Sequence, residues 1–255
     1  MTETVTDSAR EQRIAERVEQ LYANDPQFRA AASRQEVTDA AHRPGLRLAE
    51  VVDTYLRGYA DRPALGQRAC EVVRDASTDR AATTLLSGFE TITYRELGDR
   101  VAALAAAWQS GLAGGFSPGD FVGVLGFTSI DYVVHYLACI RLGAVFVPLQ
   151  TSSTAAQLGP IVAETAPRVL AVSVESLTTA VDVVAGAPSV ERLVVFDYTS
   201  DDDEQRGRYD DARAGSATPG TAPRWCRCPP SSTRVAGSQR LPRSARKMAK
   251  TRWPH

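Results

Sequence analysis

Apolar residues recur at helical spacing near the start of the chain, where most other side chains are polar or charged. Four of them share one helical face: Ile14, Val18, Leu21 and Tyr22. This spacing predicts an amphipathic helix that ends near Asn24-Asp25-Pro26. The same spacing returns from Leu48 to Tyr59. The pattern therefore predicts an N-terminal helical segment over residues 1–62.

From about residue 64 the pattern changes to short apolar runs separated by longer stretches of helical spacing. Such alternation is typical of crossover units that build a largely parallel sheet. Several runs are apolar along nearly their whole length, as expected for strands covered on both faces. The predicted strands are residues 64–73, 85–92, 121–127, 144–149, 168–174 and 192–197, and the predicted helices are 94–112, 129–142, 154–165 and 175–187. The predicted fold class is α/β, a parallel-rich sheet flanked by helices.

The helix that begins at Tyr94 carries the clearest start signal. Thr93 can accept a hydrogen bond from the first turn, and Glu96 completes the T-x-x-E pattern of a capping box. One face of this helix is apolar, formed by Leu97, Val101, Leu104, Ala105 and Trp108. We expect this face to pack on the sheet.

The character of the sequence changes after about Ala214. Gly, Ser, Thr, Pro and Arg dominate, and no helical or strand period can be traced, so the segment cannot bury enough apolar surface to offset its ordering entropy. All 30 acidic residues of the chain lie before Gly215, whereas nine of the 29 basic residues follow Ala214. We therefore expect residues 215–255 to be a disordered basic tail.

The sequence favours neither a membrane protein nor a secreted one. No apolar run approaches the ~20 residues that cross a bilayer, and residues 1–19 are polar rather than a basic start followed by an apolar stretch. The cysteines are scattered, without the spacing of paired disulfides: Cys70, Cys139, Cys226 and Cys228. We expect a cytoplasmic protein with free thiols and no membrane span.

Three segments, in this order, resemble motifs of the adenylate-forming superfamily, which includes acyl-CoA synthetases and peptide-synthetase adenylation domains. T-I-T-Y-R-E-L (91–97) resembles the first core motif and R-L-G-A-V-F-V-P-L (141–149) the second, while P-G-D-F-V-G-V-L-G-F-T-S-I-D-Y (118–132) sits where the family has a strand, a turn and a helix. Residues 1 to about 214 are similar to bacterial carboxylic acid reductases, some of which are called fatty-acid-CoA ligases. The segments that carry this narrower resemblance are 63–69, 89–97, 125–132, 147–152 and 192–198.

The resemblance implies that residues 63–214 form a partial AMP-binding (adenylation) domain, the incomplete first subdomain. In that family a complete chain activates a carboxylic acid, fatty or aromatic, with ATP and Mg²⁺. It then passes the acyl group to the phosphopantetheine thiol of a carrier domain and reduces the thioester with NADPH.

Several parts of the family's active site are absent from this sequence. The Ser/Thr/Gly-rich loop ending in P-K-G, the adenine pocket, the ribose-binding aspartate and a late lysine are missing, and the only lysines are Lys247 and Lys250. The resemblance therefore implies a fragment that is inactive alone and binds no cofactor. We assign no catalytic, cofactor-binding or metal-binding residue.

Seven positions carry the family signature: Thr93, Tyr94, Glu96, Leu97, Gly143, Ala144 and Pro148. Their chemistry is that of a scaffold, because the first four start and cap a helix and the last three bound a buried strand. We interpret them as structural positions.

Other candidate sites have simpler interpretations. Gly114-Gly115 follows a helix rather than a strand, which favours a turn over an anion-binding nest. His135 lies inside a predicted helix with no second histidine or acidic partner at ligand spacing, which favours a packed or surface side chain. Cys226-Arg227-Cys228 lacks the second pair that a zinc site needs. The acidic run Asp201–Glu204 is expected to be a solvated loop.

The basic tail leaves two interpretations open. Its positive charges, with Trp225 and Trp253, could contact nucleic acid or an acidic partner, which would make the chain a non-catalytic binding protein. Alternatively, the tail is translated out of frame, since the resemblance, the acidic residues and the apolar periodicity all end near residue 214. One insertion or deletion explains all three changes, whereas an evolved basic tail explains only the charge. We favour the frameshift and do not favour a nucleic-acid partner.

We predict that the DNA encoding Gly215–His255, read in one of the other two forward frames, continues the family pattern with acidic residues and apolar periodicity. Beyond the stop codon, that frame should encode a loop like T-S-G-S-T-G-T-P-K-G. Sequencing the gene through this region checks the prediction. Stop codons scattered through both other frames would contradict it and make the tail a segment with its own role.

Overall fold

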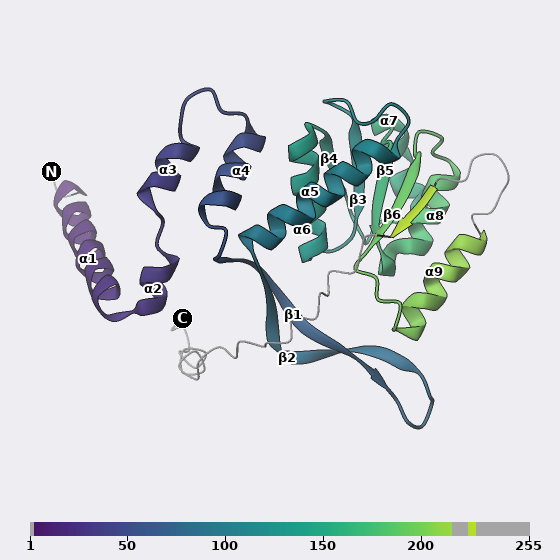
Figure 1. Ribbon diagram of the computed structural model, residues 1–255, viewed down its shortest axis with the longest axis horizontal. Helices are drawn as coiled ribbons and strands as arrows, with labels where there is room; N and C mark the ends of the chain where they lie inside the picture. Colours follow the sequence, from purple (N-terminus) through teal and green to yellow (C-terminus); the bar gives the residue numbers. More distant parts are fainter. Residues whose placement is uncertain (1–2, 216–223, 228–255) are drawn as a thin grey trace. The chain divides into compact units, whose positions relative to one another are not determined.

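The structure is a computed structural model that describes residues 3–215 and 224–227 (Figure 1). The chain divides after Thr54 into two compact units. No helix in the described ranges is long and apolar enough to span a bilayer.

The first unit is helical, as the sequence predicts. It contains α1 (Glu3–Asn24), α2 (Pro26–Ala31), α3 (Gln35–Ala41) and the beginning of α4 (Leu48–Gly58). Asp25 starts α2, because its Oδ1 accepts from the N–H of Gln27 at 2.8 Å and of Phe28 at 3.1 Å. The sequence pattern does not predict α2 and α3, since six and seven residues are too few to show a periodic apolar face.

The second unit begins with two long strands that form their own sheet. β1 (Pro63–Arg74) and β2 (Ala81–Thr93) pair antiparallel as a hairpin. The sequence pattern predicts both strands but groups them with the parallel sheet, which is wrong. Residues 75–80 join them, and this connection is too short for a parallel crossover, which needs about a dozen residues.

The main sheet is parallel and flanked by helices, which confirms the predicted fold class. Its strand order is β4-β3-β5-β6-β7, and every neighbouring pair is parallel. The strands are β3 (Phe121–Leu125), β4 (Val145–Leu149), β5 (Val169–Ser173), β6 (Arg192–Phe196) and β7 (Arg224–Arg227). The helices are α5 (Tyr94–Gly111), α6 (Ile130–Leu142), α7 (Ala155–Thr165), α8 (Leu177–Ala185), preceded by the short 3₁₀ helix η1 (Val174–Ser176), and α9 (Asp203–Gly215).

Helices cover both faces of this sheet (Figure 1). On one face, α7, α8 and α9 share a cluster of buried residues with the strands; from the sheet it includes Leu125, Leu170, Val172, Leu193 and Val195. On the other face, the ring of His135 in α6 lies 5.6 Å from the ring of Trp108 in α5 and 4.8 Å from that of Phe196 in β6. All five residues of β5 are buried, and burial of each large apolar side chain contributes roughly 1.5–3 kcal/mol. Central strands of this kind therefore supply much of the core.

The strand β7 lies inside the segment for which the sequence predicts no regular structure. Its backbone pairs with β6, with Arg224 opposite Arg192 and Arg227 opposite Val195, so the prediction is wrong for these four residues. An uncovered edge of β6 offers a row of N–H and C=O groups that any extended backbone can pair with, whatever its side chains. Residues 216–223 and 228–255, to which both interpretations of the tail largely refer, lie outside the described residues.

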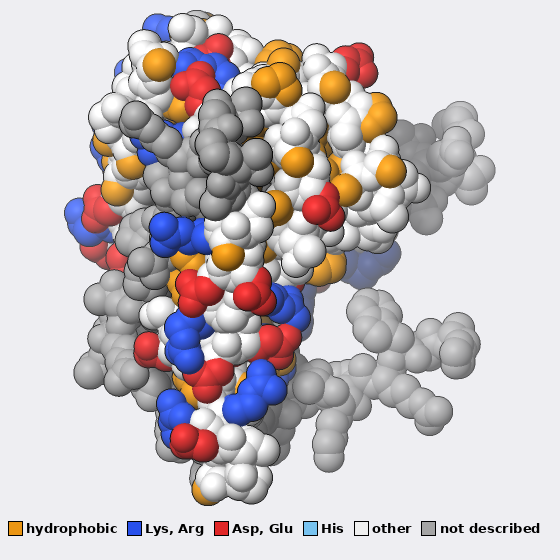
Figure 2. All heavy atoms as spheres, turned by 90° about the vertical axis from the view of Figure 1, so that its right-hand side faces the viewer, with side chains coloured by type: hydrophobic (Ala, Val, Ile, Leu, Met, Phe, Trp, Pro, Cys, Tyr) orange, Lys and Arg blue, Asp and Glu red, His pale blue; other side chains and the backbone are white. Residues whose placement is uncertain are grey.

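Acidic and basic side chains are mixed on the described part of the face shown in Figure 2. Exposed ion pairs join Arg74 to Asp79 at 3.1 Å and Arg208 to Glu204 at 2.5 Å. Exposed pairs of this kind contribute at most about 1 kcal/mol each. The specific contacts that position the hairpin must come from elsewhere.

One such contact comes from the acidic run that the sequence predicts to be a solvated loop. Asp202 is only 5% exposed; its Oδ2 accepts from the N–H of Thr83 at 2.7 Å and its Oδ1 from the N–H groups of Glu204 and Gln205, both at 3.0 Å. The neighbouring Asp203 accepts from the N–H of Ala81 at 2.7 Å. The prediction is therefore wrong for these two residues, which start α9 and bind the outer edge of β2.

We predict that Asp202→Ala lowers the free energy of unfolding by about 1–3 kcal/mol, because it leaves three partly buried N–H groups without this acceptor. Hydrogen exchange at Thr83 should also become faster, as the edge of β2 loses its carboxylate. Asp201→Ala is the matched control, since Asp201 is exposed and should leave stability and exchange unchanged. Equal effects of the two substitutions would contradict the role of Asp202.

Candidate functional site

The first group of signature positions forms the start of α5. Thr93 Oγ1 accepts from the N–H of Glu96 at 3.2 Å, and Glu96 Oε2 accepts from the N–H of Thr93 at 2.7 Å, which is the predicted capping box. This bond from Thr93 also holds the pKa of Glu96 below its usual value. The N–H of Tyr94 donates to the carbonyl of Arg62 at 3.0 Å, and Leu97 is buried. Through these contacts, all four positions help to fix the start of α5.

The second group lies at the crossover from α6 to β4. Gly143 ends α6 with a φ of +69°, a left-handed conformation that favours glycine, and its carbonyl accepts from the N–H of Gly119 at 2.8 Å. The N–H of Ala144 donates to the carbonyl of Cys139 at 2.9 Å. Pro148 lies in β4, an edge strand, where a missing N–H is tolerated. These contacts support the structural interpretation of the signature.

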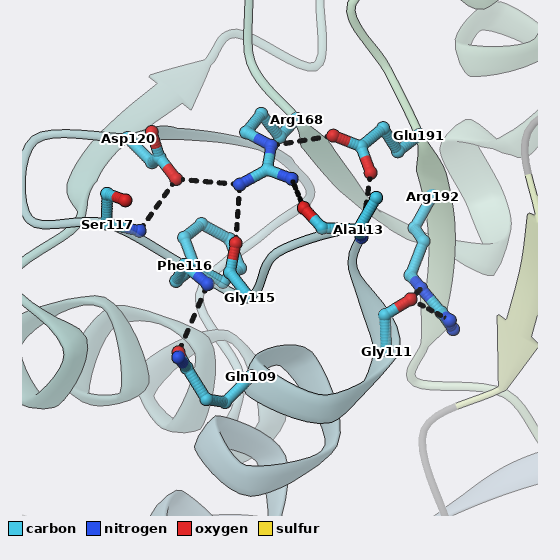
Figure 3. Close-up of polar contacts among 10 residues, drawn as sticks. All are labelled: Gln109, Gly111, Ala113, Gly115, Phe116, Ser117, Asp120, Arg168, Glu191 and Arg192. Carbon is cyan, nitrogen blue, oxygen red and sulfur yellow. Dashed lines mark hydrogen bonds and ion pairs between the residues drawn. The ribbon is translucent and has the colours of Figure 1, made fainter.

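At the amino ends of the strands, Arg168 joins several loops (Figure 3). Its guanidinium donates to Glu191 Oε1 at 2.6 Å, to Asp120 Oδ2 at 2.9 Å, and to the carbonyls of Gly115 at 2.5 Å and Ala113 at 2.7 Å. The N–H of Ser117, followed by Arg168, lowers the pKa of Asp120. Gly114 and Gly115 have φ of +75° and +71°, so they form the predicted turn. Since the donors of Arg168 are engaged by this turn and by carboxylates, this edge is a structural joint.

The opposite edge, at the carboxyl ends of the strands, is where parallel sheets bind ligands. From β3 the chain continues to β4, which lies on one side of β3, and then to β5, which lies on the other side of β3. The strand order therefore reverses between β3 and β5. Ligands of open α/β sheets bind at such a switch point. Gly126 follows β3 here because a Cβ would lie 2.6 Å from Cζ of Phe196. The polar side chains of this edge include Ser129, Asp131, Ser173, Glu175 and Asp197.

The two aspartates of this edge are withdrawn from solvent, Asp131 buried and Asp197 half-buried. Asp131 is 5% exposed, and burial raises its pKa, opposed by the N–H of Asp197 and the charge of Arg100. Burial raises the pKa of Asp197 to about 7; a hydrogen bond from Ser129 opposes the shift, while the negative charges of Asp131 and Glu175 add to it. Ionisable groups shifted this far are concentrated at functional sites, which makes this acidic edge the candidate site.

His135 lies below this edge as a packed side chain, in agreement with the prediction. It is fully buried, its Nδ1 lies 2.7 Å from the carbonyl oxygen of Asp131, and burial lowers its pKa to about 4, so the ring is neutral at pH 7. Burial raises the pKa of the Cys139 thiol to about 12, which leaves it unreactive. Among the described residues, no cluster of His, Cys, Asp and Glu could hold a metal ion. Cys228 and the side chain of Cys226 lie outside the described residues.

Sequence reasoning missed Asp131 and Asp197. A signal existed in the sequence. Asp131 comes just after Ser129, which precedes a helix, and Asp197 ends an apolar run, so both aspartates lie where a strand gives way to the next element. What the sequence did not contain was the adjacency of β3, β5 and β6, which brings these two positions, 66 residues apart, into contact.

Known proteins match both the sequence and the fold. A family model described as AMP-binding enzyme matches residues 71–235, a range that includes β7. Carboxylic acid reductases of Mycobacterium marinum and Mycobacterium tuberculosis are 46% identical over 211 residues and 49% identical over 215 residues. These matches cover 82% and 83% of this chain, which spans 18% of the length of either relative.

A solved structure agrees with these matches. It is the A domain of carboxylic acid reductase from Segniliparus rugosus, in complex with AMP and a co-purified carboxylic acid. It is 44% identical, with a TM-score of 0.80, and the match covers 84% of this chain and 34% of that one. The chain thus corresponds to about a third of the solved domain.

We predict that Thr93→Ala lowers the free energy of unfolding by about 1 kcal/mol, the usual loss for a helix cap. Chemical denaturation followed by circular dichroism measures it. Thr178→Ala on the exposed side of α8 is the control and should leave stability unchanged or slightly higher. A Thr93→Ala protein as stable as the control would show that the capping box does not hold α5.

Proposed function

This chain belongs to the family of AMP-binding enzymes, and on that premise we propose that residues 1–214 are the first part of an adenylation domain that activates a carboxylic acid. In the complete protein, ATP and Mg²⁺ would convert the acid to an acyl-adenylate. A carrier-domain phosphopantetheine would then take up the acyl group, and NADPH would reduce it, as the resemblance to carboxylic acid reductases implies.

The observation that carries this proposal is the extended similarity to carboxylic acid reductases. Identity of 46–49% continues over 211–215 residues, and both signature motifs fall within the similar folds. The match to a solved A domain extends over 84% of this chain at 44% identity. A general resemblance to α/β proteins would not keep this identity over so much of the chain.

The residues at the carboxyl edge do not fit a nucleotide phosphate. Asp131, Glu175 and Asp197 place acidic groups there, whereas a phosphate needs cations and free N–H donors. Arg168, which could supply a cation, lies at the other edge and donates to carboxylates and carbonyls. We therefore place ATP binding in the part of the relatives that this chain does not match, and we propose that the 255 residues alone do not form an acyl-adenylate.

A chimera tests the proposed role. Residues 1–214 of this chain replace the matching segment of the A domain from the Segniliparus rugosus enzyme, and acid-dependent ATP–pyrophosphate exchange is measured with a panel of aliphatic and aromatic acids. We expect exchange within roughly tenfold of the parent domain, a difference of ~1.4 kcal/mol in activation free energy.

The parent domain with this segment deleted is the control and should show no exchange. A chimera that folds, as judged by circular dichroism and a cooperative melt, yet exchanges no pyrophosphate with acids that the parent accepts would overturn the proposal.

A further inference from the structure

We propose that Asp131 and Asp197 form a proton-dependent latch that ties the start of α6 to the connection between β6 and α9 and that loosens as the solution becomes alkaline. The latch consists of these two residues and the hydrogen bond between them. The latch depends only on residues of the second compact unit, and it does not rest on the proposed function.

The latch joins two segments that are distant in sequence. Asp131 lies in the first turn of α6 and is 5% exposed. Asp197 directly follows β6, and its N–H donates to Asp131 Oδ2 at 3.4 Å. The carboxylate of Asp131 is thus held beside the backbone from which the Asp197 side chain projects.

The backbone of Asp197 is strained, which makes it dependent on its contacts. Its φ is +52°, in the left-handed region that residues other than glycine adopt only uncommonly. Strained residues persist only where surrounding contacts hold them. Any change that weakens those contacts therefore favours a different conformation of the connection over residues 197–202.

The groups around Asp197 disfavour a second negative charge. From α6 it faces the hydroxyl of Ser129 and the carboxylate of Asp131, and from η1 it faces Glu175. The nearby cation, Arg100 of α5, acts on Asp131. His135 of α6 is neutral near pH 7, because burial lowers its pKa to about 4. A proton on Asp197 therefore removes the repulsion between its carboxyl group and those of Asp131 and Glu175.

The direction of the pH effect follows from where the proton is held. The folded chain keeps a proton on Asp197 up to a pKa of about 7, whereas an unfolded aspartate releases it near pH 3.9. Stability contributed by this proton is complete below about pH 4 and is lost as the pH rises to about 7. Asp131, whose pKa is also raised, acts in the same direction.

The latch is connected through the chain to the hairpin of β1 and β2. The connection that starts at Asp197 ends at Asp202, which caps α9 and accepts from the N–H of Thr83 in β2. The pKa of Asp202 is lowered, so this residue stays ionised across the range in which Asp197 titrates. Loosening at Asp197 should therefore reach the hairpin through the connection, rather than through titration of Asp202.

Hydrogen exchange of the full chain at pH 5.5 and pH 8.5, corrected for intrinsic rates, tests the latch. We expect residues 197–202 and the amides of Ala81 and Thr83 to lose protection by on the order of tenfold at the higher pH. Asp197→Asn, which carries no charge at either pH, should keep its protection at both. Asp201→Asn is the matched control on the same connection and should show the same loss as the wild type.

A second variant keeps the proposal testable if Asp197→Asn does not fold. Asp131→Asn keeps an oxygen that can accept from Asp197 and removes one like charge that raises the pKa of Asp197, so the loss of protection should move to lower pH and become smaller. Protection of the wild type that is independent of pH, or an Asp197→Asn protein with wild-type pH dependence, would overturn the latch.

Discussion

Strands β3, β5 and β6 lie inside a parallel sheet that has helices on both faces, and most other features of the second unit follow from this arrangement. Parallel neighbours cannot be joined by tight turns, so each pair needs a crossover helix, and the crossovers cover both faces. Because all strands point the same way, the loops gather at two edges with different chemistry. The amino edge is held by Arg168, and the carboxyl edge holds the buried Asp131 and the half-buried Asp197.

The sequence predicts well those features whose cause is local. The capping box of Thr93 and Glu96 spans three residues, and the apolar runs that become β3, β5 and β6 are continuous. The interpretation of the family-signature positions as structural rests on the same local patterns and stays a prediction. In each case the physical reason lies within a few residues of the signal.

Features that depend on distant partners could not be predicted in this way. The acidic run that includes Asp202 reads as a solvated loop because its partner, the N–H of Thr83, is 119 residues away. The strand β7 reads as irregular because no apolar period marks it in the sequence, while its pairing is made by backbone groups along the edge of β6. Asp131 and Asp197 gain their shared environment only when the strand order brings them together.

The contrast between features with local causes and features that depend on distant partners also applies to function. The described residues build a sheet, fix its crossovers and place acidic groups at the carboxyl edge, whereas a triphosphate needs several cations and N–H donors; Arg100, a cation near this edge, acts on the carboxyl group of Asp131. Our account is therefore that this chain supplies scaffold to an adenylation domain whose phosphate chemistry depends on other residues. Acid-dependent ATP–pyrophosphate exchange by the purified 255-residue chain tests it most directly. The account predicts no exchange above a control without protein for any aliphatic or aromatic acid, and exchange that depends on both the chain and the acid would contradict it.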